Sequence, residues 1–118
     1  MSDIDLTGAH EYCEQYLRCV DEAVNAEDPD DARMSIGDAL MVGQMVLDVL
    51  EEAMASPTAF DCSDQLDEVM HLFILSMDTA DQAIEVGDED LGDLTLEMKR
   101  HADVALHLLT SSFGSRIG

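Results

Sequence analysis

Apolar residues recur at alternating spacings of three and four in four long segments, and this rhythm constrains the fold more than any other feature of the chain. A helix with about 3.6 residues per turn places such residues on one face, whereas a half-buried strand needs alternation at every second residue. We therefore predict helices over about residues 9–26, 31–55, 64–86 and 90–112, with Pro29 and Pro57 between helices.

Each predicted helix has an inward series with this spacing. In residues 31–55 the series is Ile36, Leu40, Gly43, Leu47, Leu50 and Met54. In the other helices the series comprise Cys13, Tyr16, Leu17, Val20 and Val24, then Leu66, Met70, Phe73, Met77, Ala80 and Ile84, and then Leu91, Leu94, Met98, Ala102, Ala105, Leu108 and Leu109. Sustained alternation of three and four favours helices that pack at shallow angles.

Short connections between the predicted helices make sequential neighbours antiparallel. We therefore expect an all-α protein, an up-down-up-down four-helix bundle that forms a single domain over residues 1–118. The segments DEAVNAED (21–28) and DQAIEVGD (81–88) are similar in character, which is compatible with a duplicated helical hairpin.

The charge of the chain restricts its partners. There are 27 acidic residues against five Lys and Arg, for a formal net charge of −22. Such a surface repels nucleic acids and anionic membranes and attracts basic proteins and cations. No apolar stretch reaches the ~18 residues that a membrane span needs. We therefore expect a basic protein as partner, without direct binding of nucleic acid or membrane.

The excess of Asp over Glu and the near absence of lysine support a second explanation of the negative charge. Asp outnumbers Glu by 17 to 10, and Lys99 is the single lysine. Carboxylates hold hydrated cations, and molar salt screens the repulsion between them. The acidity therefore also fits a housekeeping protein of a salt-rich cytoplasm.

In the predicted topology, the connections after the first and third helices emerge at the same end of the bundle. They bring eight carboxylates to one pole, with Arg33 as the nearby base, and Asp28 or Asp30 is expected to cap the second helix. The eight residues are Glu27, Asp28, Asp30, Asp31, Asp88, Glu89, Asp90 and Asp93. Eight carboxylates are more than helix capping and interaction with the helix dipoles explain, so we predict that this pole binds the partner.

The acidic segment GDEDLGDL (87–94) does not match a calcium-binding loop. A loop starting at Asp88 needs an oxygen ligand, glycine and glutamate where the chain has Gly92, Asp93 and Lys99. A looser magnesium or calcium site shared by the two turns remains an alternative.

A ferritin-like metal centre is a further alternative. Glu68 and His71 have the Glu-x-x-His spacing of di-iron bundles, but those bundles use that motif twice. Glu97 and His101 are instead spaced i, i+4. We therefore predict no metal and no cofactor.

The inward series leave apolar side chains on the outside of the second and third helices. These side chains are Met41, Val42, Met45, Val49, Leu72 and Leu75. Contiguous apolar patches usually mark interfaces, and Gly37 and Gly43 would permit close backbone approach there. We expect a homodimer or larger oligomer, or another partner, on this face. The alternative is a shifted register that places these residues in the core.

We expect a cytoplasmic protein without catalytic residues. Cys13, Cys19 and Cys62 form no CxxC pair, and the first ten residues do not resemble a secretion signal. The hydroxyl residues near His107 lack a convergent third group.

These features favour a module that binds a basic or nucleic-acid-binding protein electrostatically. Such a module acts as a decoy whose carboxylates imitate phosphates, like phage anti-defence inhibitors and immunity proteins, or as a small chaperone for a basic client. The alternatives are the ferritin-like metal-binding bundle and the salt-adapted housekeeping protein.

Overall fold

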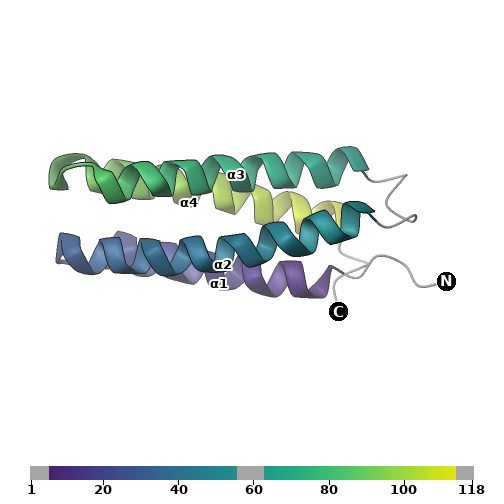
Figure 1. The fold of residues 1–118 in the computed structure, drawn as a ribbon, viewed down its shortest axis with the longest axis horizontal. Coiled ribbons are helices and arrows are strands. Elements are labelled where there is room, and N and C mark those ends of the chain that lie inside the picture. The colour runs from purple at the N-terminus through teal and green to yellow at the C-terminus, as the bar shows by residue number, and fades with distance from the viewer. Residues whose placement is uncertain (1–5, 56–62, 114–118) are drawn as a thin grey trace.

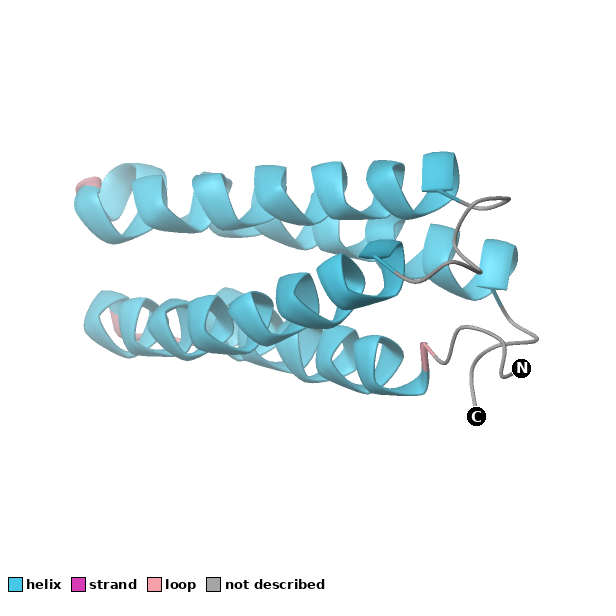
Figure 2. Ribbon diagram, turned by 45° about the vertical axis from the view of Figure 1, so that its right-hand side comes forward, coloured by secondary structure: helices cyan, strands magenta, loops and turns pink. Residues whose placement is uncertain are grey.

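The computed structural model describes residues 6–55 and 63–113, and the regular structure in these ranges is entirely helical (Figure 1, Figure 2). The helices are α1 (Thr7–Asn25), α2 (Pro29–Ala55), α3 (Ser63–Glu85) and α4 (Asp88–Phe113). Every predicted helix is present, and each end lies within two residues of its predicted position. The predicted fold class is confirmed.

The four helices lie side by side along a molecule about 50 Å long and 21 by 20 Å across. Each helix packs on two neighbours, in the order α1, α2, α3, α4 and back to α1, while α2 and α4 lie across a diagonal. Successive helices reverse direction, so the α1–α2 and α3–α4 turns lie together at one end of the bundle (Figure 1).

The start of α2 is capped by Asp28. Its Oδ1 atom accepts a hydrogen bond of 2.9 Å from the backbone N–H of Asp30. Pro29 occupies the first helical position, where the missing N–H costs nothing and the fixed φ suits a helix. Of the two predicted caps, Asp28 is the one that the chain uses.

The residues that line the core are on average smaller than the inward series predicted from the sequence. In α2 the buried positions are Ala32, Ile36, Ala39, Gly43, Val46, Leu50 and Ala53. Leu40, Leu47 and Met54, predicted to face inward, are half-buried at the flanks. Ile84 is 38% exposed, because the inward positions near the end of α3 are Ala80 and Ala83. Neighbouring columns are all apolar, so spacing alone could not distinguish them.

A buried chain of hydrogen bonds crosses the middle of the bundle. The Tyr16 hydroxyl lies 2.7 Å from Ser76 Oγ, and Ser76 Oγ donates to the backbone carbonyl of Met98 at 2.9 Å. Because the serine uses its single proton for Met98, Tyr16 is the donor to Ser76. The rings of Tyr16 and Phe73 pack with centroids 4.7 Å apart at an angle of 54°. These contacts join α1, α3 and α4.

The second helix contributes Gly43 to this junction. A Cβ at Gly43 would lie 2.9 Å from Met77 Sδ and 3.0 Å from Tyr16 Cε2. The absence of a side chain therefore lets Tyr16 and Met77 lie directly against the α2 backbone. The expectation that Gly43 serves an outer interface is wrong, whereas Gly37 has nothing within 4 Å and sits at an open position.

A comparison of alanine at these two glycines tests the junction. We expect Gly43→Ala to lower the free energy of unfolding by roughly 1–3 kcal/mol, since the Tyr16 ring must move. Gly37→Ala should raise it by about 0.5–1 kcal/mol, because alanine is the better helix former and meets no neighbour. Urea unfolding measures both values. Equal effects of the two substitutions would contradict the tight contact at Gly43.

Removal of the Tyr16 hydroxyl tests the hydrogen-bond chain. At pH 7, Tyr16→Phe should cost about 0.5–1.5 kcal/mol, because Ser76 keeps its bond to Met98. Burial raises the pKa of Tyr16 from 10.0 to about 12 in the folded protein. Its contribution is therefore complete below about pH 10 and is lost as the pH rises toward 12.

The difference in stability between the native chain and Tyr16→Phe should thus shrink as the pH rises from 10 to 12. Urea unfolding at a series of alkaline pH values measures this difference. A constant difference across the series would show that the hydroxyl does not ionise more easily on unfolding.

Candidate functional site: the acidic pole

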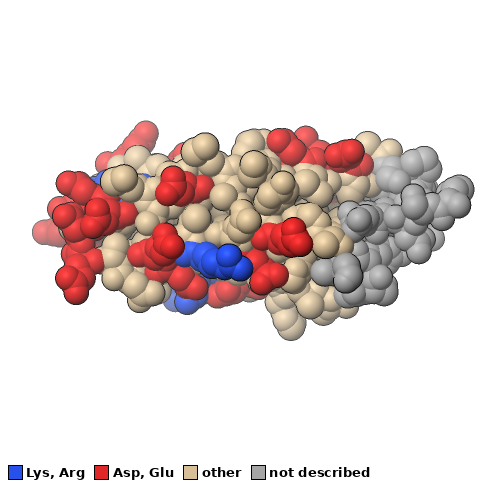
Figure 3. Space-filling view, turned by 90° about the horizontal axis from the view of Figure 1, so that it is seen from below, with Lys and Arg blue, Asp and Glu red and all other residues tan. Residues whose placement is uncertain are grey.

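The eight carboxylates of the predicted cluster lie at the end of the bundle that carries both turns, and all eight are exposed. Glu27 and Asp28 belong to the α1–α2 turn, and Asp30 and Asp31 to the first turn of α2. The other four lie in the first two turns of α4. Figure 3 shows acidic side chains crowded at this end. We call the surface formed by these eight residues the acidic pole.

Arg33 joins the two turns. Its Nη2 atom donates to the carbonyl of Val86 at 2.9 Å and to Asp88 Oδ1 at 2.7 Å. Its Nη1 atom lies 3.6 Å from Asp30 Oδ1. The side chain is 24% exposed, so these contacts are partly shielded from solvent. The sequence places Arg33 near the acidic residues but gives no sign of its bridge to Val86 and Asp88, which lie more than 50 residues away in the chain.

Two helix N-termini also face the acidic pole. Helices α2 and α4 both begin there, with Asp30 and Asp31 in the first turn of one helix and Asp88, Glu89 and Asp90 in the first turn of the other. Each N-terminus carries a partial positive charge that favours nearby carboxylates. The dipoles and Arg33 therefore offset part of the repulsion, and the exposed side chains keep the rest of the charge available to a partner.

A hollow of about 340 Å³ lies between the two turns. Val24 and Leu91 contribute to its apolar lining, together with alanines and a proline. The carboxylate residues Glu27, Asp88 and Asp93 also line it. Long basic side chains have apolar stems and charged heads, so they match this combination. No local sequence signal predicts the hollow, because it forms between segments that are distant in the chain.

The apolar residues predicted on α2 lie beside α1. Met41 and Met45 are 73% and 48% exposed, whereas Val42 is half-buried. These three residues line an open groove of about 380 Å³ together with Gln15 and Asp38. The outer surface of α2 therefore carries an apolar strip next to a carboxylate.

The remaining members of the predicted apolar face are Val49, one turn after Met45 on α2, and Leu72 and Leu75 on α3. Val49, Leu72 and Leu75 are half-buried. Met77 contacts the α2 backbone at Gly43, so its flank of α3 faces α2. Successive residues of a helix are rotated by about 100°, so Leu72 and Leu75 are rotated by roughly 140° or more around the α3 axis from Met77. They therefore lie on the side of α3 that faces α4. The structure therefore places Leu72 and Leu75 away from the groove that Met41, Val42 and Met45 line.

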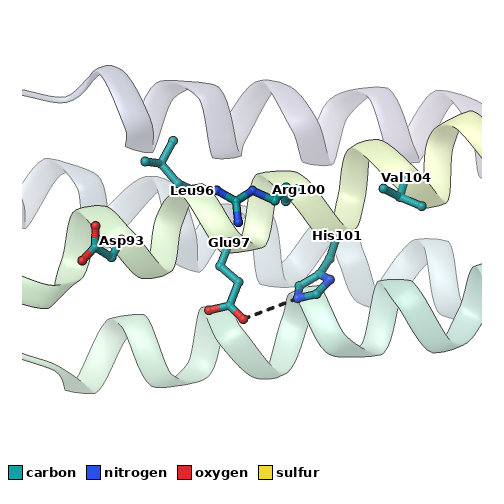
Figure 4. Close-up of a pocket in the computed structure, with 6 residues that line it drawn as sticks. All are labelled: Asp93, Leu96, Glu97, Arg100, His101 and Val104. Atoms are coloured by element: carbon teal, nitrogen blue, oxygen red, sulfur yellow. Dashed lines mark ion pairs between the residues drawn. The ribbon is translucent and has the colours of Figure 1, made fainter.

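The predicted alternatives for metal binding lack a ligand set. In residues 6–55 and 63–113, no three His, Cys, Asp or Glu side chains are placed to hold a metal ion. Glu68 and His71 are exposed on α3, and on α4 His101 Nε2 lies 3.6 Å from Glu97 Oε1 (Figure 4). The open groove around that pair is lined by residues of α4, namely Asp93, Leu96, Glu97, Arg100, His101 and Val104.

Neither of the two described cysteines has a lowered pKa. Burial raises the pKa of the Cys13 thiol to about 12, and burial also raises the pKa of Cys19. Cys62 lies outside the described residues. Ser111 Oγ donates to the backbone carbonyl of His107 at 2.8 Å, so this hydroxyl is bound to its own helix.

Comparison of the chain with protein-family models, with curated proteins and with solved structures gives no match. Across the described residues, no helix combines the length and the apolar character that a bilayer span requires. Inferences about function therefore depend on the surfaces of the molecule.

Replacement of Arg33 tests how the acidic pole is held together. We expect Arg33→Met to lower the free energy of unfolding by about 1 kcal/mol at low salt, since it removes two hydrogen bonds and leaves the carboxylates to repel one another. In ~1 M salt the loss should shrink, because the Debye length falls to about 3 Å.

Arg100→Met removes the same charge from an exposed position on α4 and serves as the control. Urea unfolding at two salt concentrations compares the variants. If Arg33→Met and Arg100→Met lose the same stability, Arg33 does not join the turns.

Proposed function

We propose that this protein is a non-catalytic binding module whose acidic pole engages a basic protein. One observation carries the proposal: eight exposed carboxylates from two turns lie at one end of a narrow bundle. Helix caps and dipoles use only one or two acids per turn, and the remaining like charges repel one another, so the crowding exceeds what the fold needs. It does produce a strong local field, which speeds association with a cationic partner.

The hollow between the turns supplies specificity to this contact. An apolar lining with Glu27, Asp88 and Asp93 accepts the stem of a lysine or arginine and places carboxylates near its charged head. An arginine side chain that fills a pocket at the centre of a contact is typical of the few residues that dominate binding energy. The partner therefore presents a basic side chain at the centre of its contact surface.

The charge density favours a decoy for a nucleic-acid-binding protein. The molecule is about 50 Å long, and its chain carries a formal net charge of −22. A DNA duplex of that length carries about 29 charges, at one per ~1.7 Å. A basic channel that binds DNA or RNA in the cytoplasm would therefore meet a similar field from this protein.

Neutralisation of the acidic pole tests the proposal. The triple variant Asp88→Asn, Asp90→Asn and Asp93→Asn is compared with the native chain in pull-downs from native lysate at working salt. We expect retention of basic proteins to weaken on the order of tenfold, since three favourable charge contacts are lost. Added duplex DNA should displace the captured proteins, because both compete for one basic surface.

The matched control is Asp67→Asn, Glu68→Gln and Asp78→Asn, which removes the same charge from exposed positions on α3. Capture of the same proteins by native chain, pole variant and control would refute binding through the acidic pole. Circular dichroism across salt examines the salt-adaptation alternative, which predicts that helicity collapses at low salt in all three proteins.

A further inference from the structure

We propose that the groove between α1 and α2 binds a basic amphipathic helix of the partner. The apolar side chains of that helix lie on the methionines of α2, and its cations face the surrounding carboxylates. The inference builds on the proposed function, because the same partner also reaches the acidic pole.

The methionines form a strip along the outside of α2. Met34 and Met41 are 71% and 73% exposed and lie two helical turns apart, and Met45 follows one turn later at 48% exposure. At ~1.5 Å per residue, the strip spans about 16 Å, or three turns of a partner helix. Methionine is flexible and polarizable, so it adapts to apolar side chains of different shapes.

Carboxylates lie beside this strip. Asp38 lines the groove with Gln15 and three apolar residues, and none of these five is basic. Burial is the main cause that raises the pKa of the Cys19 thiol, and the nearby charges of Glu22 on α1 and Asp38 on α2 raise it further. These two carboxylates therefore lie near each other across the two helices. Asp38 therefore makes the α2 wall of the groove negative, and Glu22 adds negative charge on α1 nearby.

The strip also leads to the acidic pole. Met34 follows Asp30 and Asp31 by about one turn of α2. An occupant of the groove thus meets Asp38 along its length and the acidic pole at one end. A second copy of this chain, with its own net charge of −22, would add repulsion, whereas a basic helix would be attracted.

The test uses two synthetic peptides of about 16 residues. One has leucines at helical spacings of three and four with lysines elsewhere, and the other has serine in place of each leucine. Binding is followed by fluorescence anisotropy and by NMR of the protein labelled with 13C at the methionine methyl groups. Met98 is fully buried and serves as the internal reference.

We expect the leucine–lysine peptide to bind more tightly than the serine–lysine peptide and to shift the methyl signals of Met34, Met41 and Met45 but not that of Met98. The double variant Met41→Gln and Met45→Gln should weaken this binding about tenfold or more. The control, Ile74→Gln and Val104→Gln, changes one side chain on α3 and one on α4 that are 41% and 47% exposed and should leave binding unchanged.

The outcomes separate the two proposals. If both peptides bind equally and the methionine signals do not shift, the proposed binding in the groove is wrong, whereas the proposed binding by the acidic pole is still supported. Binding of neither peptide would overturn both. If sedimentation shows a native dimer that Met41→Gln and Met45→Gln convert to a monomer, a second copy occupies the groove and the inference is wrong.

Discussion

The contact of the Tyr16 ring with the bare backbone at Gly43 sets how the helices are aligned along the bundle. The ring lies against α2, packs on Phe73 of α3 and is tied through Ser76 to the backbone of Met98 in α4. Sliding one helix by a turn, about 5.4 Å, would separate these groups and leave buried polar atoms without partners. Much of the remaining core consists of alanine and aliphatic side chains, which give little directional preference of their own.

This alignment has an electrostatic consequence at the end of the bundle. With the helices in register, both turns lie at the same level, and their carboxylates share one surface. Arg33 and the N-termini of α2 and α4 hold that surface together. A cationic partner or concentrated salt would relieve the remaining repulsion, which connects the packing of the core to the proposed mode of binding.

Sequence periodicity predicts the helices, their approximate ends and the pooling of the carboxylates, because each depends on local spacing and connection length. It does not select the inward column of α2, where Val46 rather than Leu47 is fully buried, since both columns are apolar. It also misses Ser76, because a hydroxyl in the core depends on partners in other helices. The bridge from Arg33 is missed for the same reason.

Solution NMR tests the alignment most directly, through nuclear Overhauser effects between protons that lie on different helices. Contacts are expected from the Tyr16 ring to the Gly43 α-protons and from the Arg33 side chain to Val86. Their presence would place both turns, and therefore the acidic pole, at one end of the bundle. Contacts from Arg33 to residues near the start of α3 or the end of α4, in place of Val86, would contradict the shared pole.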